Sequence, residues 1–235
     1  MRATIKEKRE VADQTLMVIL DVGPDRPGFR PGQYFWVELP DRGYHDEKGL
    51  RRHISIVTSP TEPEVLGLAT RLRDSAFKQT LAALEVGDEV HVEEPKGSFQ
   101  LPEDTGRDYV FIAGGIGITV FHSMLRYIAD TQLPYRVTLV YSNRDRASAA
   151  FLDELRDFER RIPGLTVILT MTDDPGWSGE ARRVDGRFLR EYLGDDLARY
   201  TFMVAGPPGL AEGVGDLLKE TVPEDQVIVG TFSGY

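Results

Sequence analysis

The stretch RDYVFIAGGIGITVFHSMLRY, residues 107–127, decides the fold, because in it an apolar run meets three glycines and then an amphipathic segment. The apolar run is typical of a buried strand, and residues 121–127 are typical of the beginning of a helix. Gly114, Gly115 and Gly117 fill the turn between them. Glycine lets the backbone approach an anion closely, and a helix N-terminus presents unpaired N–H groups to it. The stretch therefore predicts a phosphate cradle, although it lacks the GxGxxG pattern of the best-known dinucleotide folds.

The bulk composition is that of a soluble globular protein, with 235 residues, 41% of them hydrophobic and 28% charged. This length suits one large domain or two ordinary ones. No apolar run approaches the ~20 residues of a membrane helix, and the first residues lack the apolar core of a secretory signal. We therefore expect a cytoplasmic protein without a membrane span. The formal net charge of −10 argues against nucleic acid as a partner.

Cysteine and histidine usage excludes several kinds of site. The sequence contains no cysteine, so the chain itself carries no disulfide, no thiolate nucleophile and no iron–sulfur cluster. The four histidines, His45, His53, His91 and His122, are scattered and lack the spacing of metal ligands. We therefore expect no metal site.

The first hundred residues have the hydrophobic pattern of a β domain. Short alternating segments separated by Pro/Gly turns predict an antiparallel barrel or sandwich. One helix is expected at 75–84, where Phe77, Leu81 and Leu84 share a face and Ser75 is a natural N-cap. The expected strands are 15–22, 33–40, 53–58, 65–72 and 88–95.

From about residue 108 the pattern changes to strands that alternate with helices, which predicts a parallel sheet with both faces covered. The polar segment 101–108 separates the two patterns, and we expect domains at 1–103 and 104–235. Ligands of such sheets bind at the carboxyl ends of the strands. The expected strands are 109–113, 136–142, 165–171, 200–204 and 227–231, and the expected helical stretches are 120–130, 147–160, 185–193 and 207–221.

Two motifs occur in a fixed order, RRHISIVTSP at 51–60 and AGGIGIT at 113–119. With the β half followed by the α/β half, this ordered set resembles the ferredoxin–NADP⁺ reductase family. The resemblance covers nearly the whole chain. It implies an FAD-binding antiparallel barrel followed by an NAD(P)-binding α/β domain.

The resemblance assigns the flavin first to the segment Arg52-His53-Ile54-Ser55, which stands where the family has the signature Arg-x-Tyr/Phe-Ser. It implies that Arg52 pairs with the FAD pyrophosphate, and that Ser55 lies near flavin N5 in a catalytic role. Taken without the resemblance, Arg52 reads as a surface charge and Ser55 as a satisfied strand hydroxyl. Ile54 replaces the usual aromatic residue, so we expect weaker flavin retention or a shifted potential.

The second flavin segment implied by the resemblance is TRLRDSAFK, residues 70–78. Thr70 and Arg71 are expected to contact the flavin. The helix that begins near Ser75 is expected to turn the N–H groups of Ala76 and Phe77 toward the pyrophosphate. Taken alone, Phe77 is a core residue.

The resemblance assigns the nicotinamide nucleotide to the turns of the second domain. The glycine turn is expected to hold the pyrophosphate, the end of the second strand the adenosine part, and the turn after the fourth strand the nicotinamide. The residues concerned are Gly114, Gly115, Ile116, Gly117 and Thr119, then Ser142, Asn143 and Arg144, and then Ala205, Gly206 and Pro207.

The terminal Tyr235 is expected to lie over the isoalloxazine ring and to be displaced by nicotinamide, which gives it a catalytic role. Three positions depart from the family pattern. Val120 replaces a proline expected at the first helical position, Ala205 replaces a frequent cysteine, and Ser233 replaces a glutamate of plant-type members. A proton relay built on those side chains is absent, and hydride transfer between the cofactors does not require one.

The choice between NADH and NADPH depends on the segment MTDDPGWSGEARR, residues 171–183. Members that prefer NADPH place Ser and Arg near the 2′-phosphate, and here Thr172-Asp173 stands there. The carboxylate favours NADH, unless the loop folds so that Arg182 and Arg183 offset it.

The sequence thus predicts an FAD-dependent NAD(P)H oxidoreductase that passes hydride to flavin and then electrons to an acceptor. Ferredoxin, flavodoxin, an oxygenase component or a small molecule would serve as that acceptor. Two alternatives stay open. One is a flavin-free NAD-dependent dehydrogenase, and the other is a non-catalytic nucleotide-binding subunit of a larger electron-transfer complex.

Overall fold

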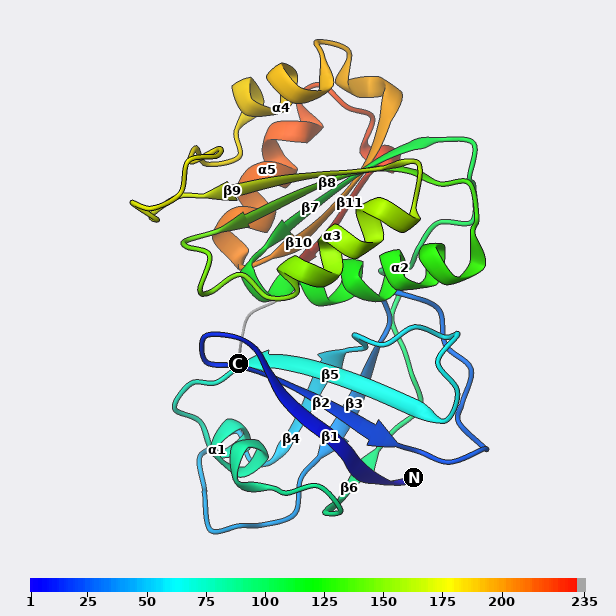
Figure 1. Ribbon diagram of the computed structural model, residues 1–235, viewed down its shortest axis with the longest axis vertical. Coiled ribbons are helices and arrows are strands. Elements are labelled where there is room, and N and C mark those ends of the chain that lie inside the picture. Colours follow the sequence, from blue (N-terminus) through cyan, green and yellow to red (C-terminus); the bar gives the residue numbers. More distant parts are fainter. Residues whose placement is uncertain (232–235) are drawn as a thin grey trace.

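The computed structural model describes residues 1–231 and divides their strands between two sheets, which lie one above the other in Figure 1. In the first sheet the strand order is β4-β3-β6-β1-β2-β5, and all pairs are antiparallel. Just after β4, the Val57 N–H donates to the Gly67 carbonyl of β5 at 2.9 Å, which links the two ends of this order. The predicted antiparallel barrel is confirmed. Its strands are β1 Arg2–Ala12, β2 Thr15–Asp21, β3 Tyr34–Glu38, β4 Arg51–Ser55, β5 Val65–Arg71 and β6 Glu89–Val92.

Strand β1 is absent from the predicted set, although it lies near the middle of the sheet between β6 and β2. Only Ala3 and Ile5 are buried on it, and the remaining residues are half-buried or exposed. Two buried positions in eleven residues give little alternation to recognise. Pairing with β2 and β6, rather than its own hydrophobic pattern, forms this strand.

Helix α1, Ala76–Ala83, lies at one end of the barrel, with Ser75 as its N-cap (Figure 1). Phe77, Leu81 and Leu84 are each about 1% exposed and join the barrel core, as the pattern predicts. The N-cap and the apolar face place the first turn of the helix beside β4 and β5.

The second sheet is parallel, with the strand order β11-β10-β7-β8-β9. The chain leaves β7 for β8 and β9 on one side, and then crosses to β10 and β11 on the other. The topological switch point therefore lies between β7 and β10, where such sheets bind ligands. The strands are β7 Asp108–Gly114, β8 Arg136–Asn143, β9 Leu165–Met171, β10 Tyr200–Gly206 and β11 Val227–Thr231.

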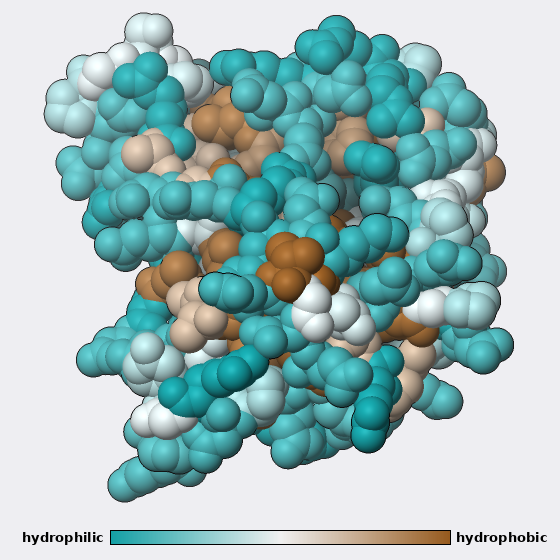
Figure 2. All heavy atoms as spheres, turned by 60° about the horizontal axis from the view of Figure 1, so that its bottom comes forward, coloured by the Kyte–Doolittle hydropathy of each residue, from teal (hydrophilic) through white to brown (hydrophobic). Residues whose placement is uncertain are grey.

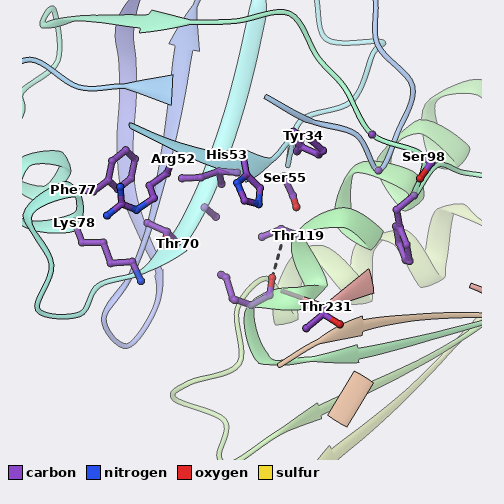
Figure 3. A pocket seen from close by; sticks show the side chains of 16 residues that line it. Tyr34, Arg52, His53, Ser55, Thr70, Phe77, Lys78, Ser98, Thr119 and Thr231 are labelled. Atoms are coloured by element: carbon purple, nitrogen blue, oxygen red, sulfur yellow. Dashed lines mark hydrogen bonds between the residues drawn. The ribbon is translucent and has the colours of Figure 1, made fainter. Parts of the chain in front are cut away.

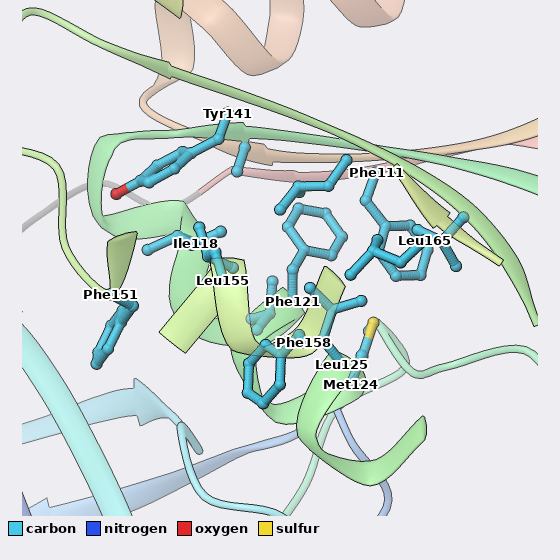
Figure 4. Packing of buried hydrophobic residues seen from close by; sticks show 14 of the residues in the cluster. Phe111, Ile118, Phe121, Met124, Leu125, Tyr141, Phe151, Leu155, Phe158 and Leu165 are labelled. Atoms are coloured by element: carbon cyan, nitrogen blue, oxygen red, sulfur yellow. The ribbon is translucent and has the colours of Figure 1, made fainter. Parts of the chain in front are cut away.

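Helices cover both faces of this sheet, as predicted. Alternate residues of β7 point to opposite faces, so Phe111 packs with α2 and α3, and Ile112 with α4 and α5. Figure 4 shows the first of these cores, in which the Phe111 and Phe121 rings stack at 4.8 Å. The helices are α2 Ile118–Thr131, α3 Leu152–Arg161, α4 Gly186–Leu193 and α5 Pro208–Lys219, with short 3₁₀ segments at Gly115–Gly117, Leu197–Arg199 and Glu224–Gln226.

The two halves pack directly on each other, because Met17, Val57 and Ala69 of the barrel belong to the core cluster of α2 and α3. A buried histidine that contacts both domains reinforces this packing. On α2, His122 Nδ1 lies 2.8 Å from the Val57 carbonyl, and its Nε2 lies 2.6 Å from the Glu154 carboxylate of α3. Glu154 also contacts Arg9 of β1 at 2.8 Å. The predicted boundary between residues 103 and 104 stays a prediction, and it falls in the segment between β6 and β7.

The surface in Figure 2 is mostly hydrophilic, and apolar side chains show mainly across the middle of that view. Within residues 1–231, no helix is both long enough and apolar enough to cross a membrane.

Candidate functional site

A cleft of about 380 Å³ opens between the barrel and the second domain (Figure 3). Most of its lining comes from the barrel, and Ile116, Thr119 and Thr231 come from the second domain. Eight residues predicted from the sequence line it: Arg52, His53, Ile54, Ser55, Thr70, Phe77, Ile116 and Thr119. The structure therefore brings segments of both predicted cofactor sites to one space.

Arg52 is held on one edge of its guanidinium group and left open on the other. Its side chain is buried, and Nη1 donates to the carbonyls of Lys48, Gly49 and Arg51 at 2.7, 3.0 and 2.8 Å. Its Nη2 is buried without a hydrogen-bond partner among the described residues, and the nearest carboxylate oxygen, on Asp46, is 3.9 Å away. A buried guanidinium nitrogen without a partner is costly, so this edge is suited to an anionic ligand.

The N-terminus of α1 lies beside Arg52, but its first N–H is already in use. The Ala76 N–H donates to Asp46 Oδ2 at 2.8 Å, and the Ser75 hydroxyl accepts from the Lys78 N–H at 3.4 Å. The hydrogen bond from Ala76 is the main cause that lowers the pKa of Asp46. A carboxylate therefore occupies the place where the Ala76 N–H was expected to face a pyrophosphate.

Lys78 is a residue of this cleft that the sequence interpretation missed. It is 4% exposed, and its Nζ has no hydrogen-bond partner among residues 1–231. Burial, followed by repulsion from Arg73 and Arg52, lowers its pKa to about 8. The signal that would have revealed it is a lysine at the third position of a helix, because a cation is unfavourable near the positive end of the helix dipole.

The glycine turn after β7 serves two purposes. Gly115 has φ +51° and open space where a Cβ would stand, which leaves room for a ligand. At Gly117 a Cβ would lie 2.3 Å from the Ala205 carbonyl oxygen, and at Gly206 it would lie 3.2 Å from the Gly114 backbone. The turns after β7 and β10 thus pack back to back at the switch point. Gly117 is therefore required for internal packing, and its contact with an anion stays a prediction.

Helix α2 begins earlier than expected. Its first residue is Ile118, so Val120 is the third helical residue and is fully buried. The expectation that Val120 occupies the first helical position is therefore wrong. Thr119 reaches the cleft, and its hydroxyl donates to the Ile116 carbonyl at 3.1 Å, as Figure 3 shows.

Other predicted site residues lie away from this cleft. Arg71 turns to the second domain and donates to the Ser148 carbonyl at 2.8 Å. Ser142, Asn143 and Arg144 lie at the carboxyl end of β8, and Arg144 contacts Asp145 at 2.9 Å. Ala205, Gly206 and Pro207 follow one another at the end of β10, beside the glycine turn. Tyr235 and Ser233 lie outside the described residues, so their roles stay predictions.

The carboxyl ends of β8 and β9 form a second hollow, which is rich in carboxylates. It is lined by residues 145–147 and 173–175, which include Asp145, Asp173 and Asp174. Asp174 is paired with Arg146 at 2.8 Å. Arg182, which the sequence offered as a counterweight to Asp173, is instead paired with Glu180 and Glu191.

The remaining cleft residues were missed for want of a pattern. Gly97 is the exception, because a Cβ there would lie 2.9 Å from the Tyr34 ring, and the PKGSFQ turn is a visible signal for such a close approach. Besides Lys78, the missed residues are Gly32, Tyr34, Ala69, Gly97, Ser98, Phe99 and Thr231.

Comparison with known proteins is consistent with this geometry. Residues 111–216 match the oxidoreductase NAD-binding domain family. The chain is 31% identical over 170 residues to methane monooxygenase component C of Methylosinus trichosporium, covering 72% of this chain and 48% of that protein. It is 27% identical over 228 residues to the propane 2-monooxygenase reductase component of Rhodococcus jostii strain RHA1, covering 92% of this chain and 60% of that protein.

Solved structures share the two-domain fold. The flavohem-like FAD/NAD-binding domain of nitric oxide dioxygenase from Vibrio cholerae O1 biovar El Tor superposes with a TM-score of 0.85 at 20% identity, covering 98% of both chains. The cytochrome P450 reductase GcoB of Amycolatopsis gives 0.83 at 24% identity, over 99% of this chain and 70% of that one. The chain spans about half to two-thirds of the length of the curated relatives it matches.

Proposed function

Since the chain belongs with the ferredoxin–NADP⁺ reductase family in its fold and in its NAD-binding domain, we propose that it is an FAD-dependent oxidoreductase. It takes hydride from NADH and passes electrons to a separate acceptor. One observation carries the proposal: the cleft between the domains is lined both by Arg52 and Ser55 of the flavin signature and by Ile116 and Thr119 of the nucleotide turn.

The residues of the cleft fit FAD. At one end, the unpartnered nitrogens of Arg52 and Lys78 suit the negative charge of a pyrophosphate. Toward the second domain, the lining includes Ser55 and Thr119, whose hydroxyl groups can hydrogen-bond a polar ring edge. FAD supplies hydride acceptance and the release of electrons singly or in pairs, chemistry that side chains do not provide.

The role of the chain is then to hold two rings at a fixed separation and to exclude water from the space between them. Ser55 is 7% exposed and comes from the last position of β4, a rigid strand of the barrel. Thr119 is 3% exposed and is fixed by its bond to the Ile116 carbonyl. Two buried hydroxyl groups on rigid elements position ring atoms more exactly than exposed loop residues would.

We propose NADH as the coenzyme. A 2′-phosphate at the ends of β8 and β9 would meet Asp173, with Arg146 and Arg182 already engaged by other carboxylates. A carboxylate ~4 Å from that phosphate costs roughly 1 to 4 kcal/mol, which corresponds to a preference of about fivefold or more. Rates measured with each nucleotide test this choice, and a clear preference for NADPH would overturn it.

We propose a separate redox protein, such as an oxygenase component or an iron–sulfur protein, as the acceptor. The matched relatives are named as parts of monooxygenase systems. A cytoplasmic location is part of the same proposal. Measuring NADH oxidation against a panel of acceptor proteins and small molecules identifies the acceptor class.

The absorption spectrum of the purified protein tests the proposal. A yellow preparation, or one reconstituted with FAD, whose flavin spectrum bleaches anaerobically with NADH supports the oxidoreductase. A colourless protein that FAD does not reconstitute would favour the flavin-free dehydrogenase, for which the cleft offers His53 and Lys78 as acid–base groups. A yellow protein inert to both nucleotides would favour the non-catalytic subunit.

A further inference from the structure

We propose that the flavin-pyrophosphate pocket contains its own competitor: the Asp46 carboxylate occupies the anion position, and a bound diphosphate replaces it and pairs with the buried Lys78. This inference rests on the proposed function, because it concerns how the chain would take up and release FAD. It assigns roles to two residues that lie outside the Arg-x-x-Ser signature.

Asp46 makes the contacts that a phosphate would make. One of its carboxylate oxygens accepts the Ala76 N–H at the beginning of α1 at 2.8 Å. The other accepts the Lys48 N–H at 2.9 Å and lies 3.9 Å from Arg52 Nη2. A helix N-terminus and a guanidinium group are the donors that a phosphate uses. Asp46 belongs to the stretch 41–50, which has no helix or strand, so the loop can carry its carboxylate away.

One carboxylate does not offset the positive charge of the pocket. Lys78 Nζ is buried and has no hydrogen-bond partner in the described part of the chain, and Arg52 Nη2 is in the same condition. The charges of Arg73 and Arg71 also act on Lys78. An unpaired buried ammonium group costs several kcal/mol, and a cation in the first turn of a helix adds to that cost. Such a group is stabilised when an anion enters.

The arrangement of the cationic groups indicates which class of anion the pocket binds. Figure 3 places Arg52, Phe77 and Lys78 on the same side of the cleft, with Lys78 extending past Thr70. Two separated cationic nitrogens and a helix N-terminus exceed what one carboxylate oxygen pair can satisfy. A diphosphate offers more oxygen atoms than a carboxylate or a single phosphate, and about twice the negative charge of a carboxylate. It therefore displaces Asp46 where a single phosphate would not. The ligand class is therefore the diphosphate of a dinucleotide, or inorganic pyrophosphate as its simplest analogue.

The test titrates flavin-free protein with FAD and follows the quenching of flavin fluorescence, which does not depend on catalysis. We expect Asp46→Asn to tighten FAD binding about tenfold, and Lys78→Met to weaken it about tenfold or more, as expected from the loss of one charge a few ångströms from the ligand. Two matched controls should leave the affinity unchanged. Asp41→Asn removes an exposed carboxylate of the same loop, which accepts the Gly43 N–H and lies 3.8 Å from His45, and Lys219→Met removes an exposed lysine of α5.

A second readout separates competition from a merely structural role. Asp46→Asn should lower the urea midpoint of the flavin-free protein, because the charge at the N-terminus of α1 is lost, while it raises FAD affinity. If the role of Asp46 is purely structural, Asp46→Asn should lower both the urea midpoint and the FAD affinity, and that outcome would overturn the inference. An FAD affinity of Asp46→Asn equal to that of the wild type would overturn it as well. Lys78→Met binding FAD as tightly as the wild type would also overturn it.

Failure of the proposed function gives a different result. Suppose that the wild-type protein binds no FAD, but that inorganic pyrophosphate raises its thermal midpoint at concentrations where phosphate has no effect. If Lys78→Met abolishes this rise, the anion pocket is supported and the flavin is not. If the wild type binds FAD and all variants match it, the proposed function stands and this inference falls. If the wild type responds to neither FAD nor pyrophosphate, both fall.

Discussion

Replacing His122 with alanine should break the buried contact that joins the two domains. Both ring nitrogens of His122 face oxygen atoms. The Val57 carbonyl can only accept, so Nδ1 donates to it, and Nε2 contacts the carboxylate of Glu154. Burial alone would raise the pKa of Glu154, but the hydrogen bond and charge of His122, together with Arg9, lower it to about 2.

The expected cost follows from these contacts. Hydrogen bonds to charged groups contribute about 1.5–3 kcal/mol each, and breaking a buried ion pair from one side costs about 3–5 kcal/mol. The alanine variant also opens a cavity between the rings of Phe151 and Phe158, whose centroids lie 4.5 and 5.3 Å from that of His122. Glu154 keeps its contact with Arg9 and is 29% exposed, which reduces the loss. We expect a destabilisation of about 3 kcal/mol, after this reduction.

Urea unfolding at pH 7 measures this value in a double-mutant cycle of His122→Ala, Glu154→Gln and the double variant. Arg9→Ala is the matched control, because it removes the other, more exposed partner of the same carboxylate and should cost less than about 1 kcal/mol. A loss at His122 below about 1 kcal/mol, or an equal loss at Arg9, would refute the stabilising role of the His122–Glu154 contact.

Three further predictions use the same kind of comparison. Because Glu154 titrates at about 2 in the folded protein, below its ordinary value of 4.5, its contribution to stability is present above pH 4.5 and is lost as the pH falls toward 2. The stability difference between wild type and Glu154→Gln should therefore shrink over that interval, and a constant difference would contradict the assignment. Gly117→Ala should cost more than about 2 kcal/mol through its clash with the Ala205 carbonyl, whereas Gly115→Ala should cost about 1 kcal/mol, and equal urea midpoints would disprove the packing role. Ile54→Tyr should tighten FAD binding in the fluorescence titration, since an aromatic face then lines the cleft, and no change would refute the role of that position.

Much of the architecture was predictable because its signals are local. The strands and helices of the second domain follow from hydrophobic periodicity, and the N-cap at Ser75 follows from residue type. Strand β1 was not predictable in this way, since the sheet around it, and not its own pattern, holds it in place. The start of α2 was misplaced because Ile118 and Thr119 look like part of the glycine turn.

The same distinction between local and long-range signals applies to the residues of the site. Arg52 and Ser55 lie within one motif, so a single match brings both to the cleft. Asp46 reaches the first turn of α1 only when the loop before β4 folds against Ala76, thirty residues later in the chain. No local pattern marks Asp46, and the helix dipole is the one clue to Lys78. The pairing of Arg182 with Glu180 and Glu191 likewise depends on how a loop folds.

The contact between the turns after β7 and β10 is made by main-chain atoms of Gly114, Gly117, Ala205 and Gly206. Substituting side chains elsewhere leaves this main-chain contact in place, so the positions proposed for the pyrophosphate and the nicotinamide rest on one block. For the proposed oxidoreductase, coenzyme preference is then set separately, by the carboxylates and arginines at the ends of β8 and β9.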